Sequence, residues 1–323
     1  MPTYNDALYI REAIDSILVQ TFKSFELLVV IDGSTDATEE ILASYADPRI
    51  KIFFHKTNQG RAAARNFALK NAAGEYLLWM DSDDIALPTR LEKQIAFMDA
   101  HPEIAVCGGA LQCFHGSDVL MQWPENHEDI HVRLAKGSTI ANPTACMRKS
   151  MLNDLLIYDL RFTQAEDYYF WICAILDFKW QAANLQDTLC LYRVRGHTGT
   201  ENHRKDHRNA LHGILDRLRI DATEEMLDAY TSLALFSKGS EEFSLLQYKD
   251  LVAVILAANK KAGIFPQKPL ATFLQNRIFH ITMSRNECSN FEKLGFYLKR
   301  QGLWTTVKKT TTWLYKICCG RFL

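Results

Sequence analysis

The sequence predicts an α/β fold in which a mainly parallel sheet carries helices on both faces, followed by a helical C-terminal region. Short apolar runs rich in β-branched residues alternate with segments of helical periodicity through about the first 110 residues. Turns with aspartate, glycine or asparagine follow these runs. From about residue 203 the periodicity is helical, without a clear strand pattern. We therefore expect an α/β domain over residues 1–202 and a helical region over residues 203–323.

The elements of the first half alternate as this fold requires. In chain order we predict helix 7–20, strand 26–31, a helix capped by 34–36 that runs to 45, strand 49–54, helix 61–71, strand 75–80, helix 87–100 and strand 104–107. Apolar residues at helical spacing, such as Ile10, Ile14 and Ile17, indicate the helices. Continuous apolar runs indicate strands that are buried on both faces.

Composition excludes several classes of protein. The 323 residues include 37 Lys and Arg against 38 Asp and Glu, which argues against a generally basic nucleic-acid-binding protein. A hydrophobic share of 48% excludes a disordered chain. The eight cysteines form no CxxC pair, which favours reduced thiols in a reducing compartment. Without a signal-peptide pattern or an apolar run of about 20 residues, we expect a cytoplasmic protein.

Two acidic turns follow predicted strands, one at Asp32 and one at Asp81 to Asp84. Open parallel sheets bind ligands at the carboxyl ends of their strands, so both turns fall where chemistry is expected. Carboxylates clustered after a buried strand repel each other, and a divalent cation such as Mg²⁺ or Mn²⁺, shared with a diphosphate, would relieve that repulsion. The alternative is a solvated turn that caps the next helix.

Two further clusters have ordinary structural explanations. Glu166 and Asp167 precede an aromatic helix start, where acidic residues are favoured by the helix dipole; a general base is the functional alternative. His197, His203 and His207 lack the spacing typical of a zinc site, so we interpret them as part of a polar loop.

Taken together, these motifs resemble the family 2 inverting glycosyltransferases, which have the GT-A fold. The similarity covers about the first 200 residues. It consists of six ordered motifs, at 2–5, 16–22, 31–36, 58–66, 74–84 and 166–167, and ends near Tyr192 and Arg193. Six motifs in order are far more specific than any one of them.

The resemblance implies a donor-binding role for five positions. Tyr4 would stack near the nucleotide base, Asp32 would hydrogen-bond the base, and Arg65 would lie near the nucleotide. Asp81 would face the ribose or the sugar, and Asp83 is the implied ligand of Mg²⁺ or Mn²⁺. A metal ion there would neutralise charge on the departing nucleoside diphosphate.

Asp167 is the implied catalytic base. The sequence also departs from the family pattern in two other places. Many relatives have a histidine in the loop that closes over the donor, whereas this sequence has Arg195 there and His197 two residues later. Both are therefore candidates to contact the diphosphate. Relatives also have an apolar first strand, which this sequence lacks before Met1. We expect the first strand to be truncated, and predict that upstream codons encode about 5–6 apolar residues.

The implied activity is metal-dependent, inverting transfer of a sugar, of the hexosyltransferase type. The donor would be a nucleotide-sugar, by expectation a UDP-sugar, and the acceptor a hydroxyl of a glycan or lipid-linked glycan in cell-surface polysaccharide synthesis. A catalytically idle nucleotide-sugar-binding or scaffold subunit is the alternative. A nucleotidyltransferase, which would release pyrophosphate, is a second alternative.

The final segment, residues 299–323, has six basic residues and no acidic one. On a helical wheel Leu303, Val307, Leu314 and Cys318 share one face, and Lys308, Lys309 and Lys316 fall on the other. A basic amphipathic helix suits an anionic membrane surface, so we expect peripheral contact with the inner face of the cell membrane. The alternative is a terminal helix docked on the enzyme. Residues 210–290 suggest helices but no function.

Overall fold

The computed structural model describes residues 1–195, 201–235 and 242–284. The chain divides into two compact units. The first comprises Met1–Asp221 and Ile264–Pro266, and the second comprises residues 222–263 and the chain from residue 267. The division predicted between residues 202 and 203 falls near the beginning of helix α7 (Glu201–Arg217), which belongs to the first unit.

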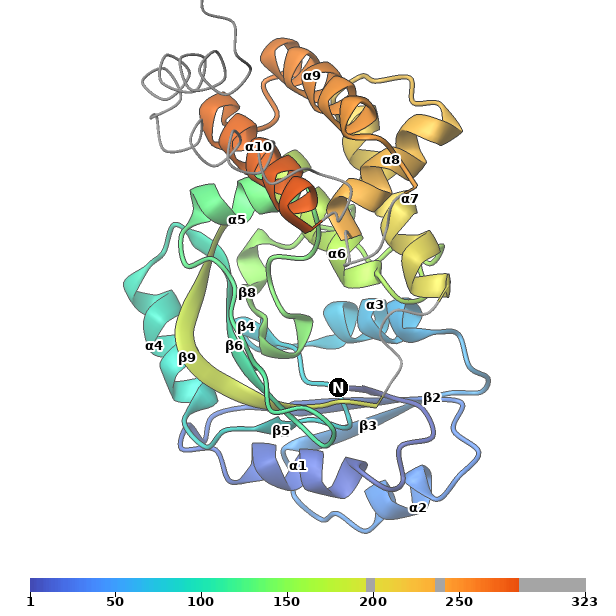
Figure 1. Cartoon of the computed structure of the whole chain (residues 1–323). Helices are drawn as coiled ribbons and strands as arrows, with labels where there is room; N and C mark the ends of the chain where they lie inside the picture. The colour runs from blue at the N-terminus through green and yellow to red at the C-terminus, as the bar shows by residue number, and fades with distance from the viewer. Residues whose placement is uncertain (196–200, 236–241, 285–323) are drawn as a thin grey trace, which may run out of the picture. The chain divides into compact units, whose positions relative to one another are not determined.

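The first unit begins with a three-stranded parallel sheet in the order β1-β2-β3. Its strands are β1 (Pro2–Thr3), β2 (Leu27–Asp32) and β3 (Ile50–His55). The helices α1 (Ile10–Leu18) and α2 (Thr38–Ala43) lie on one face of this sheet and α3 (Arg61–Asn71) on the other (Figure 1). Every residue of β2 is buried, as expected for a strand covered on both faces. The predicted parallel sheet with helices on both faces is confirmed.

A second, mixed sheet of six strands completes the α/β domain. Its strands are β4 (Tyr76–Leu78), β5 (Ile85–Ala86), β6 (Ile104–Phe114), β7 (Leu120–Met121), β8 (Cys146–Arg148) and β9 (Gln181–Arg193). The long strands β6 and β9 pair in parallel, and the other pairings in this sheet are antiparallel. Strand β9 ends two residues before Arg195, so it leads the chain to the candidate site.

The remaining elements of the first unit are short helices and turns. They are α4 (Arg90–Ala100), α5 (His127–Arg133), the 3₁₀ turns η1 (Asn142–Thr144) and η2 (Lys149–Met151), α6 (Glu166–Ile172) and the π-helical turn η3 (Cys173–Asp177). The second unit contains α8 (Glu224–Leu235), α9 (Leu245–Ala262) and α10 (Gln267–Ser284), which confirms the predicted helical C-terminal region.

None of the helices in the described part of the chain is long and apolar enough to cross a membrane. The amphipathic segment predicted over residues 299–323 lies outside the described residues, as does His197.

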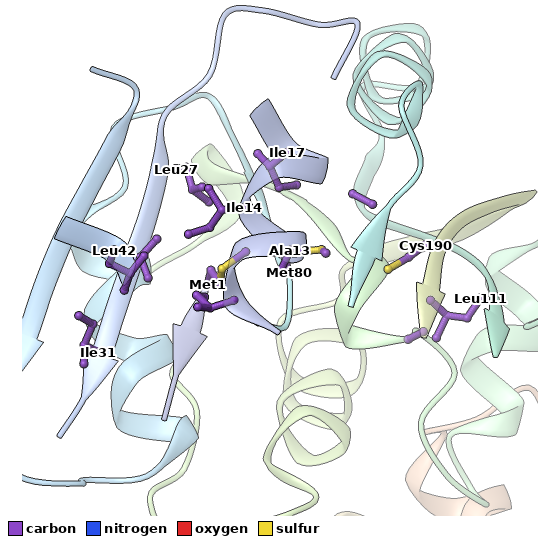
Figure 2. Packing of buried hydrophobic residues seen from close by; sticks show 14 residues of the cluster. Met1, Ala13, Ile14, Ile17, Leu27, Ile31, Leu42, Met80, Leu111 and Cys190 are labelled. Carbon is purple, nitrogen blue, oxygen red and sulfur yellow. The ribbon is translucent and has the colours of Figure 1, made fainter. Parts of the chain in front are cut away.

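The apolar face of α1 packs on β2 and holds the first sheet in place. Ile14 and Ile17 join Leu27 and Ile31 in one buried cluster, which also contains Met80 beside the acidic turn (Figure 2). Each such aliphatic side chain contributes about 1.5–3 kcal/mol on burial. This core supports the strand ends that carry the candidate site.

An apolar cavity of about 460 Å³ lies beside Met1. Its lining includes Leu27 and Leu28 of β2 and Tyr76 and Leu77 of β4. None of the candidate site residues lines it. Strand β1 has two residues, fewer than the usual 5–6, and the apolar segment expected upstream of Met1 stays a prediction.

Gly33→Ala should destabilise the turn after β2. Gly33 has a φ of +71°, and a Cβ there would meet the backbone N of Asn58 at 2.5 Å. Gly263 has a similar φ of +66° but open space around it, so Gly263→Ala measures the conformational cost alone. We expect Gly33→Ala to lower the free energy of unfolding by about 3 kcal/mol and Gly263→Ala by about 1 kcal/mol. Denaturant unfolding checks this, and equal losses would mean that the turn relaxes without cost.

Candidate active site

A second cavity, of about 410 Å³, lies at the carboxyl ends of β1 and β2 and beside the turn that follows β4. Five of the predicted site residues line it: Tyr4, Asp32, Asp81, Asp83 and Arg195. Its lining also includes Arg61 and Tyr192, which lie in or beside the family motifs but were given no role, and Asp6 and Gln164, which were not singled out. Asp6 and Gln164 are single polar residues without a local pattern, which is why the sequence did not reveal them.

Asp32 is held by the loop that follows β3. Its carboxylate accepts the backbone N–H of Gln59 at 3.0 Å and of Gly60 at 2.8 Å, and its Oδ1 lies 2.7 Å from Nδ1 of His55. A carboxylate has about four acceptor positions, so these three donors leave room for one more. Asp32 is thus fixed in place at the cavity and is still able to accept a hydrogen bond from a ligand.

The segment after β1 is tied to the segment after β2. Asn5, whose φ is +53°, accepts the backbone N–H of Thr35 through its side chain at 2.8 Å, and its own N–H donates to Ser34 at 3.0 Å. These bonds fix the backbone next to Tyr4, a residue that is 46% exposed and lines the cavity. An exposed aromatic ring on a fixed backbone can stack on a planar ligand.

The acidic turn contains one structural acid and two acids that face the cavity. Asp84 is buried, and its Oδ1 accepts the backbone N–H of Arg193 at 2.8 Å. Burial, together with the charges of Asp81 and Asp83, raises the pKa of Asp84 to about 9, so this side chain is protonated at neutral pH. Asp84 therefore belongs to the fold, whereas Asp81 and Asp83 line the cavity.

Asp83 already has a cationic partner within the chain. Its Oδ2 lies 2.9 Å from Nε of Arg195, and Arg195 also pairs with Asp6. Burial and the neighbouring carboxylate of Asp81 raise the pKa of Asp83 to about 6, while Arg195 acts in the opposite direction. The site is therefore a concentration of negative charge that attracts a cation.

These residues fit a divalent metal that is bound together with a phosphate ligand. The described residues contain no group of three or more His, Cys, Asp or Glu side chains that could hold a metal. Mg²⁺ typically uses one or two carboxylates and takes its other ligands from substrate phosphates and water. Asp83 offers such a carboxylate beside a 410 Å³ cavity, which leaves space for a diphosphate. Mg²⁺ or Mn²⁺ therefore fits the oxygen donors that are present.

Arg65 lies behind the cavity and does not line it. Its side chain is buried, pairs with Glu166 and lies 3.2 Å from Oδ1 of Asp81 through Nη2. The guanidinium also lies near the rings of Trp79 and Tyr158. Arg65 thus connects α3, the acidic turn and the start of α6. This arrangement positions Asp81; a contact between Arg65 and a nucleotide stays a prediction.

Arg65→Met should destabilise the protein, because it leaves Glu166 buried without its main partner. Breaking a buried ion pair costs about 3–5 kcal/mol, and we expect the lower value because Arg61 Nε lies 3.6 Å from the same carboxylate. Adding Glu166→Gln should restore part of the loss, because it removes the orphaned charge. Denaturant unfolding of the two single variants and the double variant tests this, and strictly additive losses would contradict the pairing.

Asp167 begins α6 together with Glu166, and its carboxylate accepts the N–H of Tyr168 at 2.7 Å. Burial and the charge of Glu166 raise the pKa of Asp167 to about 6. Asp167 does not line the cavity, although Thr163 and Gln164 of the preceding segment do. A carboxyl group whose pKa is raised in this way is a candidate proton acceptor.

The expected polar loop with three histidines is only partly what the structure contains. His203 and His207 lie in helix α7, so their interpretation as loop residues was wrong. His207 stacks on Tyr168, and its Nε2 lies 2.8 Å from the carbonyl oxygen of Lys136. Burial lowers the pKa of His207 to about 4. These packing contacts stabilise the first half of α7 as a helix, where the nearby glycine and threonine residues had suggested a loop.

Two solved structures illustrate the similarity of the fold. The crystal structure of Staphylococcus aureus TarS 1–349 in complex with UDP matches with a TM-score of 0.56 and 24% identity, over 93% of this chain and 90% of that one. The mannosyltransferase of Pyrobaculum calidifontis in complex with GDP-Man and Mn²⁺ matches with a TM-score of 0.53 and 19% identity, over 95% of this chain and 84% of that one. These matches show the fold.

The sequence comparisons show the family. The family model described as Glycosyl transferase family 2 matches residues 1–156. An uncharacterized glycosyltransferase of Rickettsia typhi is 30% identical over an alignment of 331 positions, which covers 98% of this chain and 95% of that protein. WfgD of Escherichia coli, named UDP-Glc:alpha-D-GlcNAc-diphosphoundecaprenol beta-1,3-glucosyltransferase, is 31% identical over 194 residues, which are 60% of this chain and 75% of WfgD. The chain therefore belongs to glycosyl transferase family 2 and has the GT-A fold that its motifs predicted.

Proposed function

We propose that this chain is a metal-dependent inverting glycosyltransferase of the hexosyltransferase type. It moves a sugar from a UDP-sugar to a hydroxyl of a glycan or lipid-linked acceptor in cell-surface polysaccharide synthesis. The observation that carries the proposal is the cavity in which Asp32, Asp81 and Asp83 meet the exposed ring of Tyr4. Carboxylates that can accept a base N–H or bind a cation, next to a stacking ring, suit a nucleoside diphosphate.

The donor is proposed to bind with its base between Tyr4 and Asp32. Asp32 has the free acceptor position described above, which suits the N–H of uracil. The related TarS has been solved with UDP, and the name of WfgD includes UDP-Glc, which supports a uridine nucleotide. Asp81, held by Arg65, would then face the ribose or the sugar.

Asp83 is proposed to hold Mg²⁺ or Mn²⁺, which when bound neutralises charge on the departing diphosphate. Arg195 and His197 are the proposed diphosphate contacts on the protein side, although His197 lies outside the described residues. Asp167 is the proposed general base: it takes the proton of the acceptor hydroxyl as that oxygen attacks the sugar. Attack from the face opposite the leaving group inverts the anomeric carbon.

The acceptor and the location belong to the same proposal. WfgD is named for an acceptor on diphosphoundecaprenol, which supports a lipid-linked glycan as acceptor here. We propose a cytoplasmic protein with peripheral contact at the inner face of the cell membrane. The segment proposed to make that contact, residues 299–323, lies outside the described residues.

A donor screen tests the activity. The purified full chain is incubated with Mn²⁺ and each of several UDP-, GDP- and dTDP-sugars, and nucleoside diphosphate release is measured with and without candidate acceptors. Release from a UDP-sugar that stops without metal supports the proposal. Tight UDP binding without turnover of any donor would instead favour a catalytically idle binding subunit. Release of pyrophosphate in a reaction of a sugar phosphate with a nucleoside triphosphate would favour a nucleotidyltransferase.

A further inference from the structure

We propose that Arg195 is a built-in competitor of the metal ion at Asp83, so that the free enzyme binds a divalent metal weakly and the nucleotide strengthens metal binding by drawing Arg195 away. This inference rests on the proposed function of the cavity. It concerns regulation of the donor site: the order in which the metal and the nucleotide become tightly bound.

The position of Arg195 carries the argument. Its Nε lies 2.9 Å from Oδ2 of Asp83, and its Nη2 pairs with Asp6. The guanidinium also lies over the ring of Tyr9, with 4.3 Å between Cζ and the ring centroid. It therefore forms an ion pair, without a hydrogen bond, with the carboxylate that is proposed to bind the metal, and it supplies positive charge at the same place.

Arg195 and a metal ion cannot both bind this carboxylate without an electrostatic penalty. Mg²⁺ binds carboxylate oxygens at about 2.0–2.1 Å, which would place it within about 5 Å of the guanidinium if Arg195 stayed. Two cations at that separation in a partly buried site repel strongly. A metal that binds alone must therefore break the ion pair between Arg195 and Asp83, which leaves Asp6 as the acidic partner of Arg195.

The nearby Arg193 shows how an arginine is held when its role is structural. Its side chain is 6% exposed, its Nε donates to the carbonyl oxygen of Asp83 at 2.7 Å, and its Nη2 pairs with Glu12. The side chain of Arg195 is 26% exposed, and its partners among the described residues are the side chains of Asp6, Asp83 and Tyr9. Partly exposed ion pairs contribute little stability, so Arg195 can be exchanged for another partner at low cost.

A diphosphate supplies that other partner. Arginine pairs well with phosphate oxygens, so a nucleoside diphosphate in the cavity would attract the guanidinium and free Asp83 for the metal. The two ligands then help each other, and the coupling must be reciprocal: the nucleotide raises metal affinity by the same factor by which the metal raises nucleotide affinity. Asp6 keeps a hydrogen bond from Ser82 when Arg195 leaves, so its carboxylate is not left without a partner.

The test measures Mn²⁺ binding to the full chain by electron paramagnetic resonance of free Mn²⁺, with and without UDP. Wild type is compared with Arg195→Gln and with Arg61→Gln. Arg61 lines the same cavity but pairs with Glu166 rather than Asp83, so its substitution removes the same charge without freeing Asp83. Thermal unfolding confirms that each variant is folded.

We expect Arg195→Gln to bind Mn²⁺ alone about tenfold more tightly than wild type, within the usual range of coupling between sites, and to lose most of the strengthening that UDP gives. Arg61→Gln should bind Mn²⁺ alone within about twofold of wild type, because Asp83 keeps its partner. Unchanged or weaker Mn²⁺ binding by Arg195→Gln, or an equal gain in Arg61→Gln, would overturn the inference. If Mn²⁺ does not affect UDP binding to wild type, the proposed metal-dependent function is overturned as well. This outcome distinguishes a failure of the proposed function from a failure of the inference about Arg195.

Discussion

Asp83→Ala is expected to reduce metal-dependent UDP binding and sugar transfer to background, a loss of at least about 10³-fold in kcat/KM. The lost interaction is the bond to a divalent cation, which contributes several kcal/mol to stabilising the leaving diphosphate. Asp81 is a poor substitute, because Nη2 of Arg65 lies 3.2 Å from its Oδ1 and Arg65, unlike Arg195 at Asp83, is buried away from the cavity. Nucleoside diphosphate release at a series of Mn²⁺ concentrations measures the effect.

The matched control is Asp84→Asn, one residue along the same turn. Asp84 is protonated at neutral pH because its pKa is raised to about 9, so asparagine closely imitates its neutral side chain. The amide oxygen can still accept the N–H of Arg193. We expect this variant to keep transfer within about threefold of wild type. Wild-type turnover of Asp83→Ala at limiting Mn²⁺, or an equal loss in Asp84→Asn, would assign the metal to other ligands.

The first sheet and its acidic turns could be predicted from the sequence, because both depend on local patterns. The apolar run 26–31 became β2 (Leu27–Asp32), and Asp32 and Asp83 line one cavity, although β2 and β4 belong to different sheets. Strands β8 and β9 were not predicted. The burial pattern of β9 does not alternate, and its register with β6 shifts at three places, so the period of two on which strand prediction depends is lost.

Within the site, the chemical type of each residue was predictable, but its partners were not. Three acids in one turn suggest a cation, yet nothing local shows that Asp84 is neutral and bonded to a strand more than 100 positions away. The burial of Arg65 against Glu166 likewise joins residues from distant parts of the chain. Such long-range pairs decide which carboxylates remain ionised and available to a ligand, and they become visible only when the strands are assembled.

Asp167→Asn should lower the transfer rate about 10²–10⁴-fold while leaving UDP binding unchanged, since a general base acts on the acceptor hydroxyl and not on the nucleotide. The site of the substitution lies outside the cavity lining, which agrees with a role toward the acceptor. Parallel measurements of kcat and of the UDP dissociation constant test this. Equal losses in both would place Asp167 in donor binding or in the fold.

Stability provides the check that Asp167→Asn is folded. A carboxyl group whose pKa is raised on folding stabilises the protein when protonated, and that contribution is lost as the pH rises through the folded-state pKa of about 6. At pH 7.5 the buried charge is therefore a cost to wild type that the neutral asparagine avoids. We expect the Tm of the variant at pH 7.5 to equal or exceed that of wild type, so a low rate cannot then be attributed to unfolding.

The pH profile gives the base its most specific test. In wild type kcat should rise with pH through about 6, as Asp167 loses its proton, and this limb should be absent from the residual activity of Asp167→Asn. The charge of Glu166 raises the pKa of Asp167 and that of Arg65 lowers it. Glu166→Gln should therefore move the limb to lower pH, and Arg65→Met should move it to higher pH. A limb that both variants shift in the same direction, or that survives in Asp167→Asn, would belong to another group, and Asp167 would lose its assignment as the base.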